Sequence, residues 1–467
     1  MPPILALFVW LVLLLLLLWF DPAKEPGTSA ALWVPLLWMF IDATRLPSQW
    51  LGADLGAAGS QALAEGDPLD RAVFLFLIAL AVGILITRSF KWHVFFSRNL
   101  FLMAYVLFAL LSVCWSDFPF VAFKRWGRDL GNYLMILVVL SDPHPVEAVR
   151  TLLRRLCYLV IPLSVVMVKY FPEISKHYDL WTGSPSVDGA TTSKNMLGVA
   201  CLIAGLFLFW DTTTRWSERK DRHTKRILAV NFAFMAMTLW LLALSNSATS
   251  RVCLAIGGLV VWAVRSSWGQ RHRTFIKVMI PATFCLYLIL AFGFDLNGQM
   301  ASQVGRDASL TDRTLIWQAV LGLHTNPLLG TGYESFWLGR RLDVIWAAVG
   351  HVNESHNGYL EVYLNLGLIG LFLLVGFLLT SYRRICKTLS GSTTLASFNI
   401  ALWAVVLFYN MTEAAFRFSL MWMAFLIAAI AVPSGEEVQE QSAARSERTN
   451  LSRRFRGVPL ETTGPRR

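Results

Sequence analysis

The sequence predicts an all-α, polytopic membrane protein, and three observations lead to this fold class. Apolar residues make up 55 % of the 467-residue chain, charged residues only 15 %, and the mean hydropathy is +0.53. Long apolar runs recur along the chain and are separated by polar, charged stretches. Several runs reach the roughly 17–25 residues that a ~30 Å hydrocarbon core requires. Backbone groups in lipid must be hydrogen-bonded within their own segment, so such runs predict helices.

About twelve membrane-spanning helices are expected. The first run begins the chain but lacks a basic leader and a small-residue cleavage site, so it is expected to be retained as a span. A shorter run at 31–41 is about half a span long, contains Pro35 and is expected to be interfacial or re-entrant; a thirteenth span results if it crosses. The twelve runs lie near 4–20, 72–87, 99–114, 129–140, 156–168, 196–210, 227–244, 252–264, 278–293, 359–380, 396–409 and 418–432.

The formal charge of +11 reflects topology rather than a nucleic-acid partner. Loops on one side of the expected spans, with the C-terminal tail, hold 26 of the 41 Lys and Arg residues, and the opposite loops hold 13. This asymmetry is the positive-inside rule and places both termini in the cytoplasm. A role of the basic tail in binding headgroups or nucleic acid is the less favoured alternative.

The chain divides into four parts on this topology. Residues 1–293 form membrane helices, 294–357 a large outward-facing loop, 358–432 further membrane helices, and 433–467 a basic tail that is too polar to fold on its own. The large loop contains an amphipathic helix with Thr311 or Asp312 as its N-cap, and Pro327 with the following glycines ends it in a turn.

Polar side chains with a capacity for chemistry gather in the outward-facing loops. They are Arg306, Arg313, Tyr333, Glu334, Arg340, Arg341, His351 and His356 in the large loop, Lys194 and Asn195 at one span mouth, Arg251 at another, and Glu413 and Arg417 in the last hairpin. Guanidinium groups bind phosphate oxygens bidentately, and a neutral histidine can take a proton from a hydroxyl. Together they indicate group transfer from a lipid diphosphate. No metal and no cofactor are expected, because the outer loops contain no Asp-x-Asp pair and no His/Cys ligand spacing. Arginines that only snorkel, or pair with a carboxylate such as Glu413, are the alternative.

The stretch "ESHNGYLEVYLNLGLIGLF", residues 354–372, leads from polar residues directly into a span. Ser355 or Asn357 is expected to cap the helix, and Gly358 to let another group approach closely. Glu361 lies about one helical turn from His356, where it orients a partner or pairs with an arginine.

Three motifs resemble the bacterial O-antigen ligase and polymerase superfamily, with the nearest likeness to exopolysaccharide polymerases of the succinoglycan type. They are "GRDASLTDRTLIWQ", "NPLLGTGYESFW" and "ESHNGYLEVYLNLGLIGL", and "SKNMLG" and "SNSATSR" match further segments. The resemblance implies a multi-pass inner-membrane glycosyltransferase whose large loop is periplasmic. Its donor is an undecaprenyl-diphosphate-linked oligosaccharide and its acceptor a glycan hydroxyl, with no metal or nucleotide sugar.

The resemblance also implies roles for residues. His356 is the candidate base or acceptor-orienting residue, and Arg313 and Arg251 match arginines that hold the diphosphate. Arg306 is a weaker match, and Arg417 and Glu413 are weaker still. Asn357, Glu361, Tyr333 and Lys194 complete the candidate substrate-binding set.

The expected function is a glycan polymerase of exopolysaccharide or O-antigen synthesis. One alternative is a ligase that transfers the finished glycan to lipid A-core or protein. Another is a polysaccharide transporter or flippase, which predicts charges at mid-span and paired interrupted helices. A chain-length regulator and a flippase are further candidate partners, and no nucleic acid is expected.

Overall fold

The computed structural model describes residues 2–21, 27–52, 66–88, 90–178, 185–293, 308–391 and 394–432, and these residues are almost entirely helical. The fold class predicted from the sequence is confirmed. The strands are β1 (Lys176–Tyr178) and β2 (Pro185–Val187), which form an antiparallel hairpin. The longer helices are α1 (Pro3–Trp19), α2 (Trp33–Ala43), α5 (Pro68–Thr87), α7 (Leu100–Leu111), α8 (Pro119–Leu140), α9 (Pro145–Tyr170), α11 (Lys194–Arg215), α12 (Arg222–Ser245), α13 (Ala248–Arg265), α15 (Arg273–Gly293), α17 (Ala308–Leu321), α18 (Gly339–Val349), α19 (Gly358–Gly391), α20 (Thr394–Tyr409) and α21 (Leu420–Ala429). Short helices are α3 (Pro47–Trp50), α6 (Trp92–Arg98), α10 (Pro172–Ser175), α14 (Ser267–Arg271) and the 3₁₀ turns η2 (Ala30–Leu32), η3 (Ser112–Trp115) and η4 (Trp216–Glu218).

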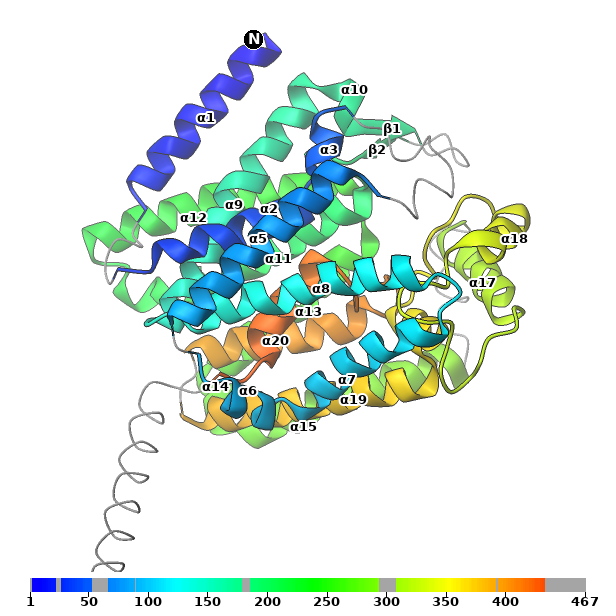
Figure 1. The fold of residues 1–467 in the computed structure, drawn as a ribbon. Coiled ribbons are helices and arrows are strands. Elements are labelled where there is room, and N and C mark those ends of the chain that lie inside the picture. The colour runs from blue at the N-terminus through cyan, green and yellow to red at the C-terminus, as the bar shows by residue number, and fades with distance from the viewer. Residues whose placement is uncertain are drawn as a thin grey trace, which may run out of the picture.

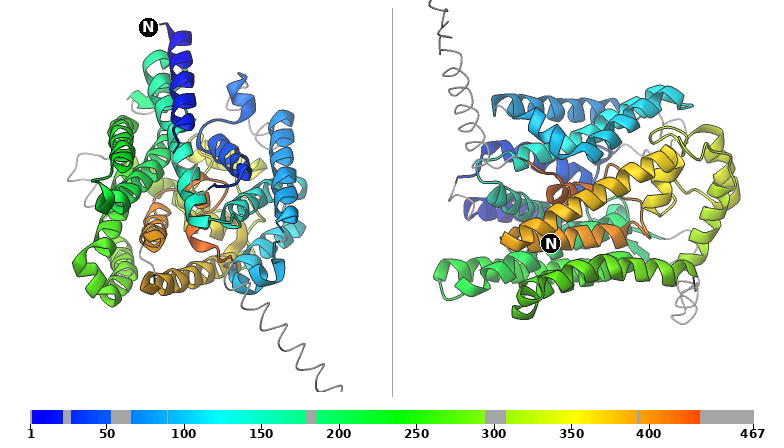
Figure 2. Two further views of the ribbon diagram at one scale, coloured as in Figure 1. Left: turned by 90° about the vertical axis from the view of Figure 1, so that its left-hand side faces the viewer. Right: turned by 90° about the horizontal axis from the view of Figure 1, so that it is seen from below.

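The long helices form one bundle, and α17 and α18 cap one of its ends (Figure 1). Viewed along the bundle, the helices surround a centre that contains α21 (Figure 2). Among the described residues, seven helices are long and apolar enough to cross a membrane, and an eighth span results if α6 and the helix after it, bent by 95°, are counted as one. Four shorter apolar helices include α1 and α21. Each expected span coincides with a helix, and the count of twelve stays a prediction.

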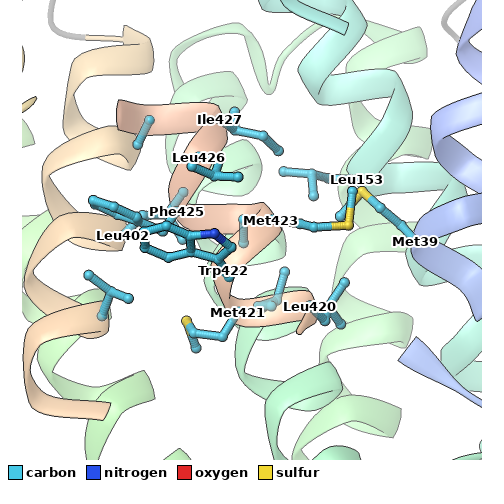
Figure 3. Close-up of a cluster of buried hydrophobic side chains, with 14 of the residues drawn as sticks. Met39, Leu153, Leu402, Leu420, Met421, Trp422, Met423, Phe425, Leu426 and Ile427 are labelled. Carbon is cyan, nitrogen blue, oxygen red and sulfur yellow. The ribbon is translucent and has the colours of Figure 1, made fainter. Parts of the chain in front are cut away.

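Helix α21 is apolar on every face, and every one of its ten residues is buried. Trp422, Met423 and Phe425 pack with Met39 of α2, Leu153 of α9 and Leu402 of α20 (Figure 3). A helix that is hydrophobic all round belongs in an interior. It positions the polar segment just before it, residues 410–417, between α20 and the centre of the bundle.

The run at 31–41 forms α2, which packs against α9, α5 and α8, and its Trp38 is fully buried. The Trp38 indole donates a 2.7 Å hydrogen bond to Asn132 of α8. One face of α2 is buried against these helices, whereas Trp33 and Leu37 on it are each 46 % exposed. Whether the run is interfacial or re-entrant stays a prediction.

Helix α19 breaks at Gly367, where φ is +63°, and a segment of the preceding loop fills the break. The backbone N–H groups of Leu368 and Ile369 donate to the carbonyls of Pro327 and Leu328 at 2.8 and 3.2 Å. A Cβ on Gly367 would lie 2.3 Å from the Leu328 carbonyl, so only glycine fits. Non-helical backbone within a span is tolerated where protein satisfies its hydrogen bonds.

The same loop is anchored by Asn365 of α19. Its side-chain oxygen accepts from the N–H groups of Ser335 and Phe336 at 3.0 and 3.1 Å, and its carbonyl accepts from Gly332. The loop motif "GTGYESF" is therefore a docking segment, and it delivers Glu334 to the end of the bundle where α17 and α18 lie.

Candidate active site

Polar residues from separate parts of the sequence meet at this end of the bundle. They come from the N-terminus of α11, from α17, from residues 354–358 before α19, and from residues 410–417 between α20 and α21. Gly358 joins two of these segments, because its N–H donates to the carbonyls of Asn410 and Glu413 at 2.8 and 3.0 Å. A Cβ there would lie 2.0 Å from the Asn410 side-chain oxygen, which confirms the close approach expected at this glycine.

Glu413 is the hub of the cluster. Its side chain is 6 % exposed and accepts from Arg313 at 3.0 Å and from Asn195 of α11 at 3.2 Å. The His356 Nδ1 lies 3.4 Å from the same carboxylate. Three segments of the chain are thus held by one buried carboxylate.

Arg417 sits beside this hub and pairs with two further carboxylates. It contacts Glu354 directly and lies 3.9 Å from Glu334. Glu354 in turn lies 3.0 Å from His356 Nδ1. Burial lowers the pKa of the Arg417 guanidinium, but the charges of Glu354 and Glu334 outweigh it and hold that pKa above its usual value.

The surroundings of His356 favour its protonated form. Burial lowers its pKa, but hydrogen bonds to Glu354 and Glu413 and their charges outweigh burial and raise the pKa to about 10. Burial raises the pKa of Glu354, but Arg417 and His356 overcome it and lower the pKa to about 2. The two carboxylates that flank the ring favour the imidazolium over the neutral imidazole, and the role of His356 as a base stays a prediction.

The backbone at the cluster is strained. Among the described residues, those other than glycine with positive φ are His356 (+49°), Glu334 (+50°) and Asn246 (+51°). His356 and Glu334 both flank Arg417 and Glu354, and Asn246 accepts a 2.9 Å hydrogen bond from Arg251. Left-handed backbone costs energy for residues with a side chain and tends to occur at functional sites.

A set of buried hydrogen bonds supports the turn that carries His356. Glu361 accepts from the N–H and hydroxyl of Ser355 at 3.1 and 2.9 Å and from the indole of Trp337 at 2.5 Å. Asn357 accepts from the N–H groups of Tyr359 and Leu360 at 3.1 Å, which makes it the cap of α19, one of the two alternatives expected. Glu361 thus orients residues 354–358 and is hydrogen-bonded by Ser355 and Trp337 rather than ion-paired to an arginine.

Helix α8 contributes residues that the sequence analysis did not assign to the site. Arg125 donates to the Glu334 carbonyl at 2.5 Å, and Asp129 accepts from the Tyr333 hydroxyl at 2.7 Å. Tyr333 is buried, so it positions the loop that ends in Glu334. The basic stretch "KRWGRD" before the apolar part of α8 is the sequence signal for these two residues. Glu354 is a further residue of the cluster that the sequence analysis does not predict.

The expected residues divide into three groups. Arg313, His356, Glu413 and Arg417 meet in one cluster, although Arg417 and Glu413 were the weakest matches. Asn357, Glu361 and Tyr333 support it, and Lys194 begins α11 one position before Asn195. Arg251 lies apart and donates to Asn246 and to the Ala243 carbonyl, and Arg306 lies outside the described residues.

The helices of the large loop differ from expectation. Helix α17 begins at Ala308, so Thr311 and Asp312 lie inside it and neither is the N-cap. A second helix, α18, follows and packs on α17 through Ile316, Val320, Leu342 and Ile345. This small apolar core fixes α17, and with it Arg313, over the end of the bundle.

Glu354, His356 and Glu413 have ligand atoms within 4.8 Å of one another, as a divalent metal site requires. The donor set does not fit a metal well, because guanidinium groups already pair with both carboxylates. A cation would have to displace these charges. Metal-independent chemistry stays a prediction.

The sequence is similar to a known protein family and to one characterised protein. A family model described as O-antigen ligase matches residues 189–375, a range that contains Asn195, Arg313, Glu334 and His356. The exopolysaccharide production protein ExoQ of Rhizobium meliloti (strain 1021) is 25 % identical over 301 residues, which is 62 % of this chain and 65 % of the relative. The chain therefore matches slightly less than two thirds of that relative's length.

Proposed function

We propose that the chain is a multi-pass inner-membrane glycan polymerase of the O-antigen ligase/polymerase superfamily, which the family match over residues 189–375 and the likeness to ExoQ support. Its donor is a glycan on undecaprenyl diphosphate, and its acceptor is a hydroxyl of another lipid-linked repeat. Both termini lie in the cytoplasm, and residues 294–357 face the periplasm.

The observation that carries this proposal is the cluster itself. Arg313, Arg417 and His356 supply three positive charges within one network, and each is held by Glu354 or Glu413. A diphosphate offers the same kind of charge-assisted acceptor as these carboxylates, with more oxygens. We expect it to compete for the same donors when the lipid-linked substrate binds.

The reaction breaks the bond between the sugar anomeric carbon and the diphosphate oxygen, and forms a bond from that carbon to the acceptor oxygen. Negative charge grows on the departing diphosphate, where fixed cationic donors stabilise it. A protonated imidazole donates from both ring nitrogens, so His356 keeps its carboxylate partner on Nδ1 and offers Nε2–H to the substrate. The acceptor proton passes to a carboxylate of the cluster, for which Glu413 is placed between Arg313 and His356.

The test uses cells that lack the native gene and express Arg313→Ala or His356→Ala. Either variant, present at normal level in the membrane, is expected to make little polysaccharide. Arg340→Ala is the matched control, because Arg340 is an exposed arginine of the same loop, on α18. If cells with Arg313→Ala or His356→Ala still make full-length polysaccharide, the substituted residue has no role in glycan transfer.

The second candidate is a ligase that transfers a finished glycan to lipid A-core or protein, which the description of the matched family favours. A deletion strain distinguishes the two. Short lipid-linked repeats would accumulate if the protein polymerises, and long unattached chains would accumulate if it ligates.

A transporter or flippase is the less favoured alternative. The α19 break that could suggest an interrupted transport helix is filled by residues 327–332. The described cation cluster lies at one end of the bundle rather than at mid-span, which suits catalysis at a membrane surface.

A further inference from the structure

At the end of the bundle opposite the active-site cluster, a groove of about 490 Å³ opens where η4 meets α12. Its lining combines Arg219, Lys220 and Lys225 with the apolar side chains of Trp216, Leu228 and Phe232. All three cations are exposed. The groove is unrelated to the proposed transfer reaction, because it lies near the C-terminal end of α11, and Asn195 of the active-site cluster lies at the N-terminal end.

The apolar part of the groove belongs to a membrane-facing surface. Helix α12 is one of the seven candidate spans, and only 39 % of its most apolar window is buried within the protein. Phe232 is 53 % exposed and lies about ten residues into the helix, roughly 15 Å from its start. Side chains there face the upper part of a lipid acyl chain.

The cationic part lies where α12, as a membrane span, would meet the lipid headgroups. Lys225 is in the first turn of α12, and Arg219 and Lys220 lie in the turn before the helix. The guanidinium of Arg219 is 5.3 Å from the centre of the Trp216 ring and donates to the Trp216 carbonyl at 3.0 Å, so it is held at the edge of the groove. Tryptophan and basic residues in this position are typical of the lipid–water interface.

Carboxylates close to the groove do not neutralise it. Asp221 uses its side chain to cap α12, accepting from the Thr224 N–H at 2.8 Å. Glu218 is exposed on η4 and does not line the groove. Positive charge next to an apolar channel complements a molecule with a phosphate at one end and a hydrocarbon chain at the other.

We propose that this groove binds one anionic phospholipid, with its phosphate between Arg219, Lys220 and Lys225 and an acyl chain along Leu228 and Phe232. A zwitterionic lipid would present the same phosphate together with a cation, which the three basic side chains repel. The site therefore selects for net negative headgroup charge.

Native mass spectrometry of the detergent-purified full chain tests the proposal, with phosphatidylglycerol and phosphatidylcholine as the probes. The wild type is expected to retain one phosphatidylglycerol more strongly than phosphatidylcholine. Lys220→Gln with Lys225→Gln is expected to weaken that binding roughly tenfold to thirtyfold, if each lysine contributes as a basic residue near an anionic surface does.

The matched control is Arg222→Gln with Arg226→Gln, which removes two exposed cations of the same helix that do not line the groove. It is expected to leave the selective binding intact. Equal losses in the two double variants, or equal retention of the two lipids by the wild type, would overturn the proposal. Displacement of the lipid by millimolar inorganic phosphate would also overturn it and indicate a site for a free anion.

Discussion

Two clusters of arginines and carboxylates lie near opposite ends of α11, and they differ in backbone rather than in composition. At one end, Asn195 joins the Glu413 cluster; sixteen residues later, about 24 Å along the helix, Asp211 pairs with Arg150, Arg154 and Arg215. The residues that contact Asp211 lie on the regular helices α9, α11 and α12; the Arg154 side chain is 2 % exposed and also pairs with Asp21, which follows α1. The Glu413 cluster lies largely on turns, and two of its residues have left-handed backbone.

This difference indicates what each cluster does. The Asp211 cluster has the features of a structural site: the Asp211 side chain is fully buried, its partners lie on regular helices, and three arginines compensate its charge. The Glu413 cluster leaves Arg417, Glu354 and His356 about a quarter exposed, so a ligand can reach them. Residue type alone would not separate the two clusters.

The largest effect on stability is expected in the Asp211 cluster. Asp211→Asn leaves Arg150 and Arg154 buried with less compensating charge, and such a change typically costs about 3–5 kcal/mol. The free energy of unfolding or the Tm of the purified protein should fall sharply, and the amount in the membrane with it. An unchanged Tm would mean that this cluster does not stabilise the fold.

Arg417→Ala, in contrast to Asp211→Asn, is expected to lower the rate of glycan transfer and to leave the stability of the protein nearly unchanged. The rate of glycan transfer should fall by about 10²–10³, as when one preorganised donor is removed. Membrane levels should stay near wild type, because Arg417 lies at a partly exposed site. Activity measured per amount of membrane protein checks this, and a loss of protein instead of rate would assign the Glu413 cluster a structural role.

The pH dependence of stability tests whether His356 is an imidazolium paired with Glu354 and Glu413. Its pKa is raised in the folded protein to about 10 from an ordinary value near 6.5, so its stabilising contribution is complete below about pH 6.5. The contribution is lost as pH rises through 10. The Tm difference between wild type and His356→Gln should therefore shrink between pH 6.5 and 10, whereas the difference for Arg340→Ala should stay flat. A difference that stays constant over this range would contradict the ion-paired imidazolium.

The smallest effect is expected at Asn246, and it tests whether Arg251 belongs with the Glu413 cluster. Asn246→Gly keeps the left-handed backbone accessible and removes the side-chain oxygen that holds Arg251. Arg251 lies apart from the cluster, so the Tm and the rate of transfer should both hardly change. A fall in transfer of about tenfold, as for one lost hydrogen bond to a charged group, would assign Arg251 to the reaction.

The sequence predicted the helical membrane fold well, because the long apolar runs fix the helices that lipid or the bundle must surround. It missed α18, whose apolar face packs on α17, and it gave no indication that Trp38 in the half-length run of α2 is fully buried. In the candidate site, Arg313 and His356 were found from their loop positions and the family likeness. The central position of Glu413 and Arg417 was not, because it depends on residues 410–417 returning beside Asn195, more than 200 positions away in the chain.

The pKa of His356 could not be predicted either. It depends on Glu354 and Glu413, one near and one far in sequence, facing the same ring nitrogen. The left-handed backbone at His356 and Glu334 is also invisible to composition and periodicity.

The most direct test of the central claim, that the Glu413 cluster holds a lipid diphosphate, is the binding of farnesyl diphosphate, a short soluble analogue of the donor lipid, to the purified protein. Wild type and Arg340→Ala should bind it equally, and Arg313→Ala combined with Arg417→Ala should lose most of the affinity. Farnesyl monophosphate should bind more weakly than the diphosphate to the wild type. Equal affinity of the wild type and the double variant for farnesyl diphosphate would contradict the account.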